Sequence, residues 1–326
     1  VVEEVVANIL RVYQEHFSNS FFPVLQPAIG VGSAFEGWSA PEDADGIYRV
    51  LVPLQPPRGH AFHPELDIAG QNLERNFCIC VELDCTCPME QLVGQNMLCF
   101  LHHPEEQLRR NQDPSLLSTL CTGSYLDVQK TAHWFQNFVR SAWVQVPQSH
   151  QYNMSVLPSS CSCRMKLTDA TRRTILAEVM FGVQQGDSDI FLSSHITEAT
   201  FISSTTWTES CTVAEVKFFR HIAGRVPHGS FHLRCLQLCT RILMGTGFST
   251  YTMKTVLIPL LASTHPSDWH KIHFLRRLED IMGYMHFCLQ ERRLNHFFFG
   301  SENVPEEIIL PTFFHISDPI NLFQGL

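Results

Sequence analysis

Charged residues are scarce in this chain, and the basic ones do not gather. Asp, Glu, Lys and Arg make up 17% of the 326 residues, and 23 basic against 32 acidic residues give a formal net charge of -9. The longest basic clusters are pairs, such as Arg109 with Arg110 and Arg276 with Arg277. Capture of nucleic acid depends on a basic field that attracts phosphate. The composition therefore argues against a nucleic-acid partner.

Long apolar runs are also missing. A membrane-spanning helix needs about 20 predominantly apolar residues, whereas the longest run here, around residues 255–262, is short and contains Pro259. No signal-peptide pattern is present. Because the chain starts at Val1 without Met, we expect a preceding segment, and a targeting or anchoring element would lie there.

The C-x2-C knuckles typical of zinc sites are missing, although the chain contains 12 cysteines. Four of them, Cys78, Cys80, Cys85 and Cys87, follow a C-x-C-x4-C-x-C spacing in an alternating, strand-like run. This spacing differs from that of zinc knuckles, so we interpret these cysteines as small buried strand residues or free thiols. The cysteine count fits a reducing compartment, and we expect no zinc.

Apolar residues, by contrast, are plentiful. Hydrophobic residues make up 44% of the chain and include 24 Phe. A chain of this length and composition can bury a substantial core, in one large domain or two of ordinary size. The sequence pattern changes from mixed α/β in residues 1–205 to mostly helical in residues 206–326, which we take as the two domains.

Hydrophobic periodicity predicts the main elements. Residues 2–17 have the i, i+3, i+4 spacing of an amphipathic helix, and Asp127 is the predicted N-cap of a helix that runs to Trp143. Strands are predicted at 47–54, 77–87, 97–101, 152–158, 163–169 and 174–184, with a Pro-rich and His-rich loop over 55–65. Helices dominate from residue 213, and Ser267 is the predicted N-cap of the last long one.

An acidic pair precedes the strand at 47–54. Asp43 and Asp45 are two residues apart, so on an extended segment their carboxylates leave the backbone on the same face. A turn formed by Gly32 and Ser33 precedes them and could face a phosphate with its backbone N–H groups. This arrangement suits a metal-dependent phosphoryl transferase, whereas a solvated turn is the simpler alternative.

A single carboxylate interrupts the apolar strand at 174–184. An unpaired carboxylate in such a strand would be expensive to bury, so Glu178 needs a reason to be there. Three explanations remain open from the residues alone: Glu178 is a metal ligand, the partner of a buried base, or a residue on a solvent face.

The segment GVGSAFEGWSAPEDAD, followed by a hydrophobic strand, resembles the signature of the Mab-21 family, whose best-known enzyme is cyclic GMP-AMP synthase. FSTYTMKT at 248–255, HPSDW at 265–269 and LNHFFFG at 294–300 fall in the family's order, so the resemblance covers nearly the whole chain. GHAFH, CFLHHPEE and FGVQQGDSDIF resemble the inositol trisphosphate receptor-interacting protein-like branch of the family.

The resemblance implies an α+β fold, with a nucleotidyltransferase-like lobe built on a central mixed sheet and a helical lobe after it. It also implies a site for NTP and Mg²⁺ in the cleft between the lobes. The implied catalytic and metal-binding carboxylates are Asp43, Asp45 and Glu178. The implied nucleotide-binding residues are Gly32 and Ser33 at the phosphate turn, and Thr250 and Tyr251 near the base.

Several positions depart from the synthase. Glu178 stands where the synthase has Asp, and Mg²⁺ demands near-ideal octahedral geometry at short distance. Gln237 stands where the synthase grips phosphate with lysine. The zinc thumb with which the synthase binds DNA has no counterpart around residues 221–239. These departures favour a degenerate enzyme.

We therefore expect an interaction or regulatory module, a pseudo-nucleotidyltransferase that acts in signalling. The resemblance implies a single-pass membrane protein, tethered through the segment before Val1, on a side of the membrane that the resemblance does not fix. Its implied partner is the inositol trisphosphate receptor or another membrane receptor. The alternatives are an active metal-dependent nucleotidyltransferase that uses NTP and a nucleotide-binding switch without turnover.

Overall fold

The computed structural model describes residues 1–38, 46–67, 75–88, 97–195, 203–243, 250–300, 303–316 and 320–323. The chain forms two compact units made of alternating segments. The first comprises Val1–Ile29, Arg49–Gln184 and Phe191–Ser210, and the second comprises Gly30–Tyr48, Gln185–Ile190 and Cys211–Leu326. The division into residues 1–205 and 206–326 stays a prediction.

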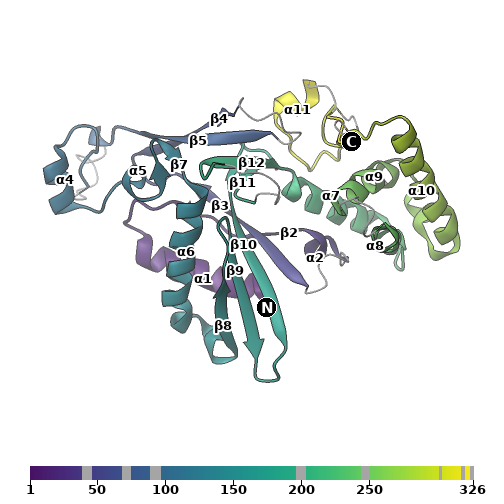
Figure 1. Cartoon of the computed structure of the whole chain (residues 1–326), viewed down its shortest axis with the longest axis horizontal. Coiled ribbons are helices and arrows are strands. Elements are labelled where there is room, and N and C mark those ends of the chain that lie inside the picture. Colours follow the sequence, from purple (N-terminus) through teal and green to yellow (C-terminus); the bar gives the residue numbers. More distant parts are fainter. Residues whose placement is uncertain are drawn as a thin grey trace. The chain divides into compact units, whose positions relative to one another are not determined.

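A sheet forms the body of the first unit (Figure 1). Its central strand is β10 (Thr174–Gln184), which pairs antiparallel with β9 (Cys163–Asp169) along one half and with β11 (Phe191–Ser193) along the other. The main strand order is β1-β3-β10-β11-β12-β5-β7-β6, with β4 on β5 and β8 on β9. The remaining strands are β1 (Val24–Leu25), β3 (Ile47–Gln55), β4 (His60–Leu66), β5 (Asn76–Leu83), β6 (Cys121–Thr122), β7 (Tyr125–Leu126), β8 (Tyr152–Leu157) and β12 (Thr206–Ser210).

The apolar character of β10 follows from its central place. Residues 177–183 are all buried, and a strand buried on both faces has a nearly continuous apolar sequence. Gly182 allows a close approach here, because a Cβ atom at this position would lie 3.0 Å from Leu51 Cδ1. The predicted strands at 152–158, 163–169 and 174–184 are confirmed.

Two amphipathic helices pack together in the first unit, α1 (Val2–Phe17) and α6 (Val128–Ala142). Tyr13 of α1 lies edge-on to Phe138 of α6, with ring centroids 5.4 Å apart. Asp127 caps α6, because its side chain accepts a hydrogen bond from the backbone N–H of Lys130 at 3.0 Å. Both helices and this cap agree with the sequence prediction. Shorter helical segments of this unit are α4 (Glu105–Asn111), α5 (Leu116–Thr119), η2 (Trp143–Gln145) and η3 (Pro147–His150).

Three local predictions were wrong. The loop predicted over 55–65 contains β4, which pairs with β5 from His60 opposite Leu83 to Leu66 opposite Phe77. Residues 97–101, predicted as a strand, form an irregular segment and a turn. The last long helix begins only at Phe274, because two 3-10 turns, η4 (Pro266–Trp269) and η5 (Lys271–His273), precede it.

Helices dominate the second unit and enclose its core. They are α2 (Ser33–Glu36), α7 (Thr212–Arg225), α8 (His232–Ile242), α9 (Thr250–Ser263), α10 (Phe274–Gln290) and α11 (Thr312–Ile316), and the short strand β2 (Ile29–Val31) begins at the boundary between the units. Large side chains such as Trp269, Phe218 and Phe298 fill the core. A mixed sheet followed by a helical region confirms the α+β, nucleotidyltransferase-like fold class.

The expected single-pass membrane localisation is contradicted. In the part of the chain that the structure describes, none of the helices combines the length and the apolar character that crossing a bilayer requires.

Candidate functional site

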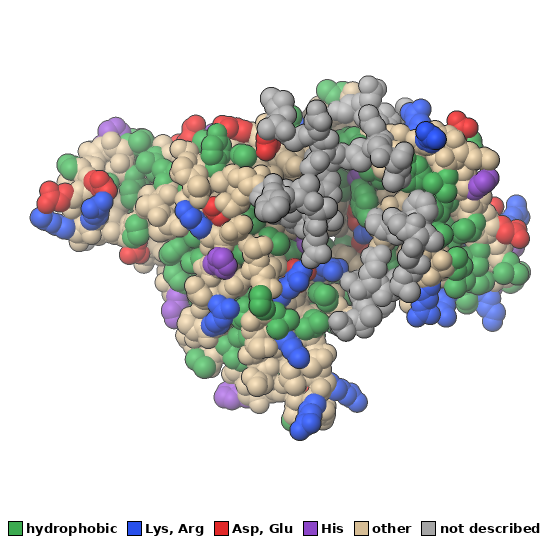
Figure 2. All heavy atoms as spheres, in the orientation of Figure 1, with side chains coloured by type: hydrophobic (Ala, Val, Ile, Leu, Met, Phe, Trp, Pro, Cys, Tyr) green, Lys and Arg blue, Asp and Glu red, His purple; other side chains and the backbone are tan. Residues whose placement is uncertain are grey.

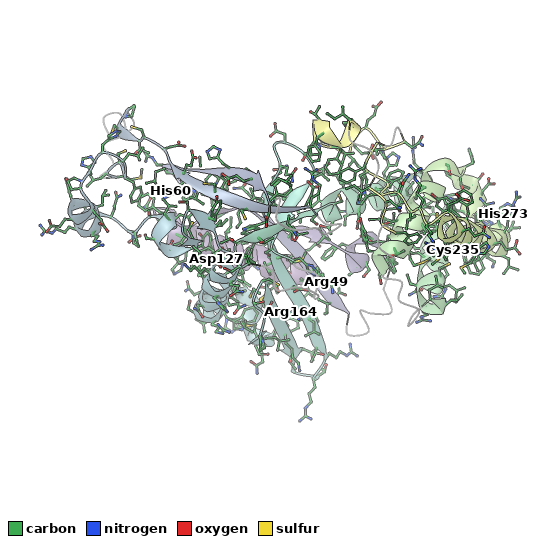
Figure 3. All side chains as sticks on the ribbon, turned by 45° about the horizontal axis from the view of Figure 1, so that its top comes forward. Arg49, His60, Asp127, Arg164, Cys235 and His273 are labelled. Atoms are coloured by element: carbon green, nitrogen blue, oxygen red, sulfur yellow. The ribbon has the colours of Figure 1, made fainter. Side chains whose placement is uncertain are left out.

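Glu178 lies in the middle of β10 with only 1% of its surface exposed. Both of its carboxylate oxygens are hydrogen-bonded. Oε1 accepts from the Ser162 hydroxyl at 2.7 Å and from Nε of Arg164 at 2.9 Å, and Oε2 accepts from Nε of Arg49 at 3.3 Å. Arg164 is the cross-strand neighbour of Glu178 in the β9–β10 register, and Arg49 comes from β3. Figure 3 shows the two arginines, Arg49 on β3 and Arg164 on β9, the strands that pair with β10.

The surroundings keep Glu178 ionised. Burial raises the pKa of its carboxyl, but hydrogen bonds from Ser162 and Arg164 and the charge of Arg164 outweigh burial, so the pKa lies below its usual value. Opposite charges and hydrogen bonds to a carboxylate act in this direction. The strand thus contains a buried carboxylate ion paired with two partly exposed guanidinium groups. The role of Glu178 as a metal ligand stays a prediction.

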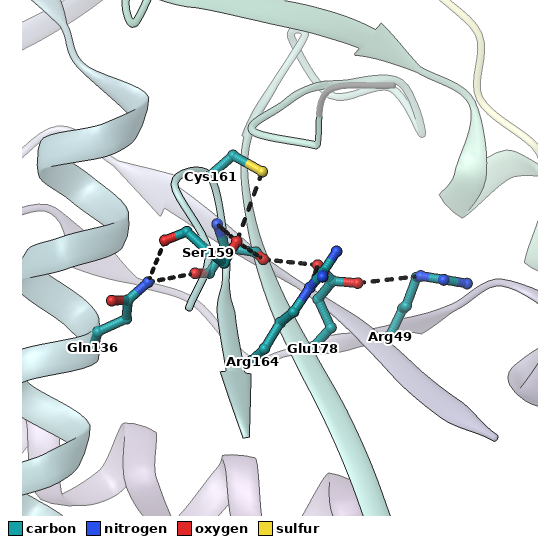
Figure 4. A network of polar contacts seen from close by, with 7 residues as sticks. Arg49, Gln136, Ser159, Cys161, Arg164 and Glu178 are labelled. Atoms are coloured by element: carbon teal, nitrogen blue, oxygen red, sulfur yellow. Dashed lines mark hydrogen bonds and ion pairs between the residues drawn. The ribbon is translucent and has the colours of Figure 1, made fainter. Parts of the chain in front are cut away.

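A chain of hydrogen bonds extends from Glu178 to α6 (Figure 4). The Ser162 hydroxyl contacts the Ser159 hydroxyl at 2.8 Å. The side-chain amide of Gln136 on α6 donates to the carbonyl oxygens of Ser159 and Ser162 at 2.9 and 2.8 Å. Because each buried polar group is satisfied by its neighbour, the network fixes the position of the Glu178 carboxylate.

The structure describes both residues of the implied phosphate turn, whose role in phosphate binding stays a prediction. Gly32 has φ +80°, a region that L side chains rarely adopt, and it precedes the short helix α2, which begins at Ser33. Ser33 is buried. Asp43 and Asp45, the first two predicted metal ligands, lie outside the described residues.

The implied base-binding residues start α9. Thr250 is the first described residue of that helix and is partly exposed. Tyr251 is 37% exposed, and its ring centroid lies 6.0 Å from that of His296. Gln237 lies on α8, where its side-chain oxygen accepts a hydrogen bond from Arg234 at 2.8 Å. The role of Thr250 and Tyr251 in nucleotide binding stays a prediction.

A buried charge cluster in the second unit was missed in the sequence. Lys254 of α9 forms ion pairs with Glu36, which ends α2, at 2.9 Å, and with Glu215 of α7. Trp38 donates from its indole Nε1 to the other Glu36 oxygen at 2.8 Å. Burial would lower the pKa of Lys254, but the two carboxylates raise it above its usual value. Lys254 is thus held as a cation, which joins α2, α7 and α9.

This cluster gives part of the GSAFEGW segment a structural role. Glu36 and Trp38 bind within the helical core, so they hold the turn at Gly32 and Ser33 on a packed support. A sequence signal existed, because Glu215 and Lys254 each interrupt apolar helical runs, and such charges are rarely buried unless paired. That Lys254 pairs with Glu36 and Glu215 could be seen only in the folded structure.

Residues 234–308 match the family model described as Mab-21 protein HhH/H2TH-like domain. The whole chain aligns at 32% identity with the Rattus norvegicus protein named inositol 1,4,5-trisphosphate receptor-interacting protein-like 1, covering 61% of that protein. The Homo sapiens inositol 1,4,5-trisphosphate receptor-interacting protein is 29% identical over 91% of this chain and 57% of its own length. The chain thus spans about three fifths of these relatives. The likeness to their branch, expected from the sequence, is confirmed.

Proposed function

We propose that this chain, which belongs to the Mab-21 family, is a protein-interaction module on a nucleotidyltransferase-like fold that has lost turnover. The observation that carries the proposal is the pairing of Glu178 with Arg49 and Arg164. In an active site of this type, carboxylate oxygens bind the divalent ions that activate a hydroxyl and stabilise pyrophosphate. Here both oxygens of the third carboxylate already bind cationic side chains.

Electrostatics support the loss of metal binding at Glu178. Among the described residues, Glu178 and its two guanidinium partners sum to a charge of about +1, which disfavours the approach of a divalent cation to this carboxylate. Mg²⁺ also tolerates little departure from octahedral geometry. To bind a metal, Glu178 would have to break ion pairs in a largely buried position, and breaking such pairs is costly.

The interaction half of the proposal rests on the relatives and on α10. Both relatives are named for interaction with the inositol 1,4,5-trisphosphate receptor, and we propose this receptor, or another membrane receptor, as the partner. On α10, Leu275, Met282 and Leu289 are 72%, 37% and 39% exposed. Seven-residue spacing places them on one side of the helix. Figure 2 shows hydrophobic side chains at the surface of the helical region.

A turnover assay tests the loss of catalysis. The purified chain is incubated with each NTP and with Mg²⁺ or Mn²⁺, and pyrophosphate release is measured. We expect the same background rate for the unaltered chain and for Asp43→Ala. Release that depends on metal and disappears in Asp43→Ala would establish the active nucleotidyltransferase instead.

A binding assay separates the carboxylate network from the helical surface. The immobilised chain is offered detergent-solubilised inositol trisphosphate receptor, and retained receptor is quantified. We expect the triple variant Leu275→Glu, Met282→Glu, Leu289→Glu to lose at least tenfold in retention, while Glu178→Gln keeps it. The control is Glu105→Gln with Glu106→Gln on α4. Loss of retention in Glu178→Gln alone would contradict the proposal.

Thermal unfolding distinguishes the remaining alternative, a nucleotide-binding switch. A ligand that binds only the native state raises the melting temperature. We expect no shift with NTP and Mg²⁺ or Mn²⁺. A rise that needs both nucleotide and metal, without pyrophosphate release, would favour the switch.

A further inference from the structure

Three cysteines and a histidine converge beside the end of β5 in the first unit. Cys85 and Cys87 follow β5, while Cys99 and His102 lie in the segment that leads to α4. Their ligand atoms all lie within 4.8 Å of one another. In sequence they form C-x-C-x11-C-x2-H, a spacing that no short zinc knuckle predicts.

The distances within this Cys3His cluster (Cys85, Cys87, Cys99 and His102) match a tetrahedral metal site. Nδ1 of His102 lies 3.5 Å from Sγ of Cys85, 3.1 Å from Sγ of Cys87 and 3.5 Å from Sγ of Cys99. Zinc binds sulfur at about 2.3 Å and imidazole nitrogen at about 2.0–2.1 Å, which in a tetrahedron separates nitrogen from sulfur by about 3.5 Å.

Hydrogen bonding alone does not account for this arrangement. A neutral imidazole nitrogen has one lone pair or one hydrogen, so Nδ1 can form one good hydrogen bond and not three. Nor do disulfides, because all three cysteines are free thiols. A shared cation explains why three sulfur atoms surround one nitrogen.

We propose that Cys85, Cys87, Cys99 and His102 bind one Zn²⁺ as a closed structural site. Four nitrogen and sulfur ligands without a carboxylate fill a tetrahedral shell, which is the composition of structural zinc sites, whereas catalytic sites leave a position open. Soft thiolate ligands favour zinc over Mg²⁺ or Ca²⁺. The proposal replaces the expectation of no zinc. It is separate from the nucleotidyltransferase-like site, since its ligands belong to neither the carboxylate network nor the phosphate turn.

The surroundings support a bound thiolate. The backbone N–H of Thr86 donates to Sγ of Cys99 at 3.4 Å, and such donors stabilise the negative charge on a metal-binding sulfur. Cys99 is fully buried, and backbone N–H groups of His102 and His103 donate to its carbonyl oxygen at 3.3 and 3.2 Å. This turn brings the His102 ring back over the sulfur atoms.

The zinc ion would hold α4 on the first unit. None of the residues of α4 is buried, so the helix contributes no apolar core of its own. Figure 1 shows α4 at the edge of the sheet unit, and Figure 2 shows acidic and basic side chains gathered there. Small regions without a sufficient core commonly depend on a metal for their folding energy.

The test measures metal in the 326-residue chain, purified without a polyhistidine tag from cells supplied with zinc. Mass spectrometry of the metal content should give one zinc per chain. The double variant Cys87→Ser, Cys99→Ser should fall below a tenth of that. Its matched control is Cys78→Ser with Cys80→Ser on neighbouring β5, which should keep the metal. Equal zinc loss in both double variants would overturn the proposal.

A cobalt experiment keeps the proposal falsifiable if the variant fails to fold. Zinc in the unaltered chain is exchanged for Co²⁺, and the expected result is the visible absorption of a tetrahedral site with thiolate charge transfer. Chelator treatment should also accelerate proteolytic cleavage around α4 at least fivefold, with zinc restoring protection. A chain that carries less than a tenth of an equivalent of zinc and gives no thiolate–cobalt absorption would refute the site.

Discussion

Glu178 illustrates how much one residue reveals at the scale of a side chain. Its place in an apolar strand signalled from sequence alone that it needed a reason, and left a metal ligand, a base partner and a solvent face open. The sequence could not identify Arg49, which is far away along the chain, because that pairing depends on which strand lies beside β10. The resemblance supplied a metal role for the same residue, whereas the described contacts are with arginine and serine.

Replacing Glu178 with Gln should destabilise the protein by roughly 1–3 kcal/mol. Gln keeps the shape and can accept a hydrogen bond, but Arg49 and Arg164 lose their counter-charge. The two arginines are 29% and 44% exposed, so water compensates part of the loss. Urea unfolding at pH 7 measures the change. The control, Glu105→Gln, removes an exposed ion pair on α4 and should cost well under 1 kcal/mol. An equal cost for both variants would contradict the structural role of Glu178.

At the scale of elements, periodicity predicted best where one face alone is buried. The helix over Val2–Phe17 and the N-cap at Asp127 were found because apolar spacing and capping are local. Strand β4 was missed, since Pro, Gly and His residues predicted a loop and pairing with β5 overrode them. The Cys3His cluster was also missed, because only long-range contacts bring its ligands together. Half of the four-cysteine pattern lies in β5, and the other two ligands come from a later segment.

The cap of α6 allows a prediction about a single element. The Asp127 side chain accepts from the N–H of Lys130 and from the hydroxyls of Thr122 and Ser204, each of the latter at 2.7 Å. Asp127→Ala should cost roughly 2–3 kcal/mol of unfolding free energy, because it removes the cap and leaves two hydroxyls without an acceptor.

Asp127→Asn is the discriminating variant for this cap. Its side-chain oxygen can still accept from Lys130, so it should cost less than half as much as Asp127→Ala. Hydrogen exchange at the Lys130 amide should speed up in the alanine variant and stay slow in the asparagine variant. Asp113→Ala, an exposed position, should leave both quantities unchanged. If Asp113→Ala cost as much as Asp127→Ala, the capping argument would be wrong.

At the scale of the molecule, the sequence predicted the fold class through patterns and resemblance, but not its long-range contacts. The turn at Gly32 is local, and its glycine could be read from the sequence. Its support could not, because Lys254 reaches Glu36 only after the helices of the second unit have packed. Buried charges and buried histidines therefore make the stability of the assembled core depend on pH.

Stability should decline as pH falls from about 6.5 to 4. Burial lowers the pKa of both His232 and His296 to about 4. The unfolded chain takes up these protons near pH 6.5 while the folded chain resists, so acid favours unfolding. Glu178, whose pKa is also lowered, adds to the loss below about pH 4.5. Glu36 acts in the opposite sense, because burial, opposed by Lys254, raises its pKa.

His296→Asn tests this dependence. The backbone N–H of Phe298 donates to Nδ1 of His296 at 3.3 Å, and the Asn side-chain oxygen can take the place of that acceptor without titrating. One such histidine costs about 2 kcal/mol between pH 7 and pH 5 when its pKa falls from 6.5 to about 4. Urea unfolding at both pH values should therefore show a loss smaller by about that amount in His296→Asn. His286 is exposed, so His286→Asn is the control and should lose as much unfolding free energy between pH 7 and pH 5 as the unaltered chain. An identical loss in the unaltered chain, His296→Asn and His286→Asn would show that His296 is not held neutral by its burial.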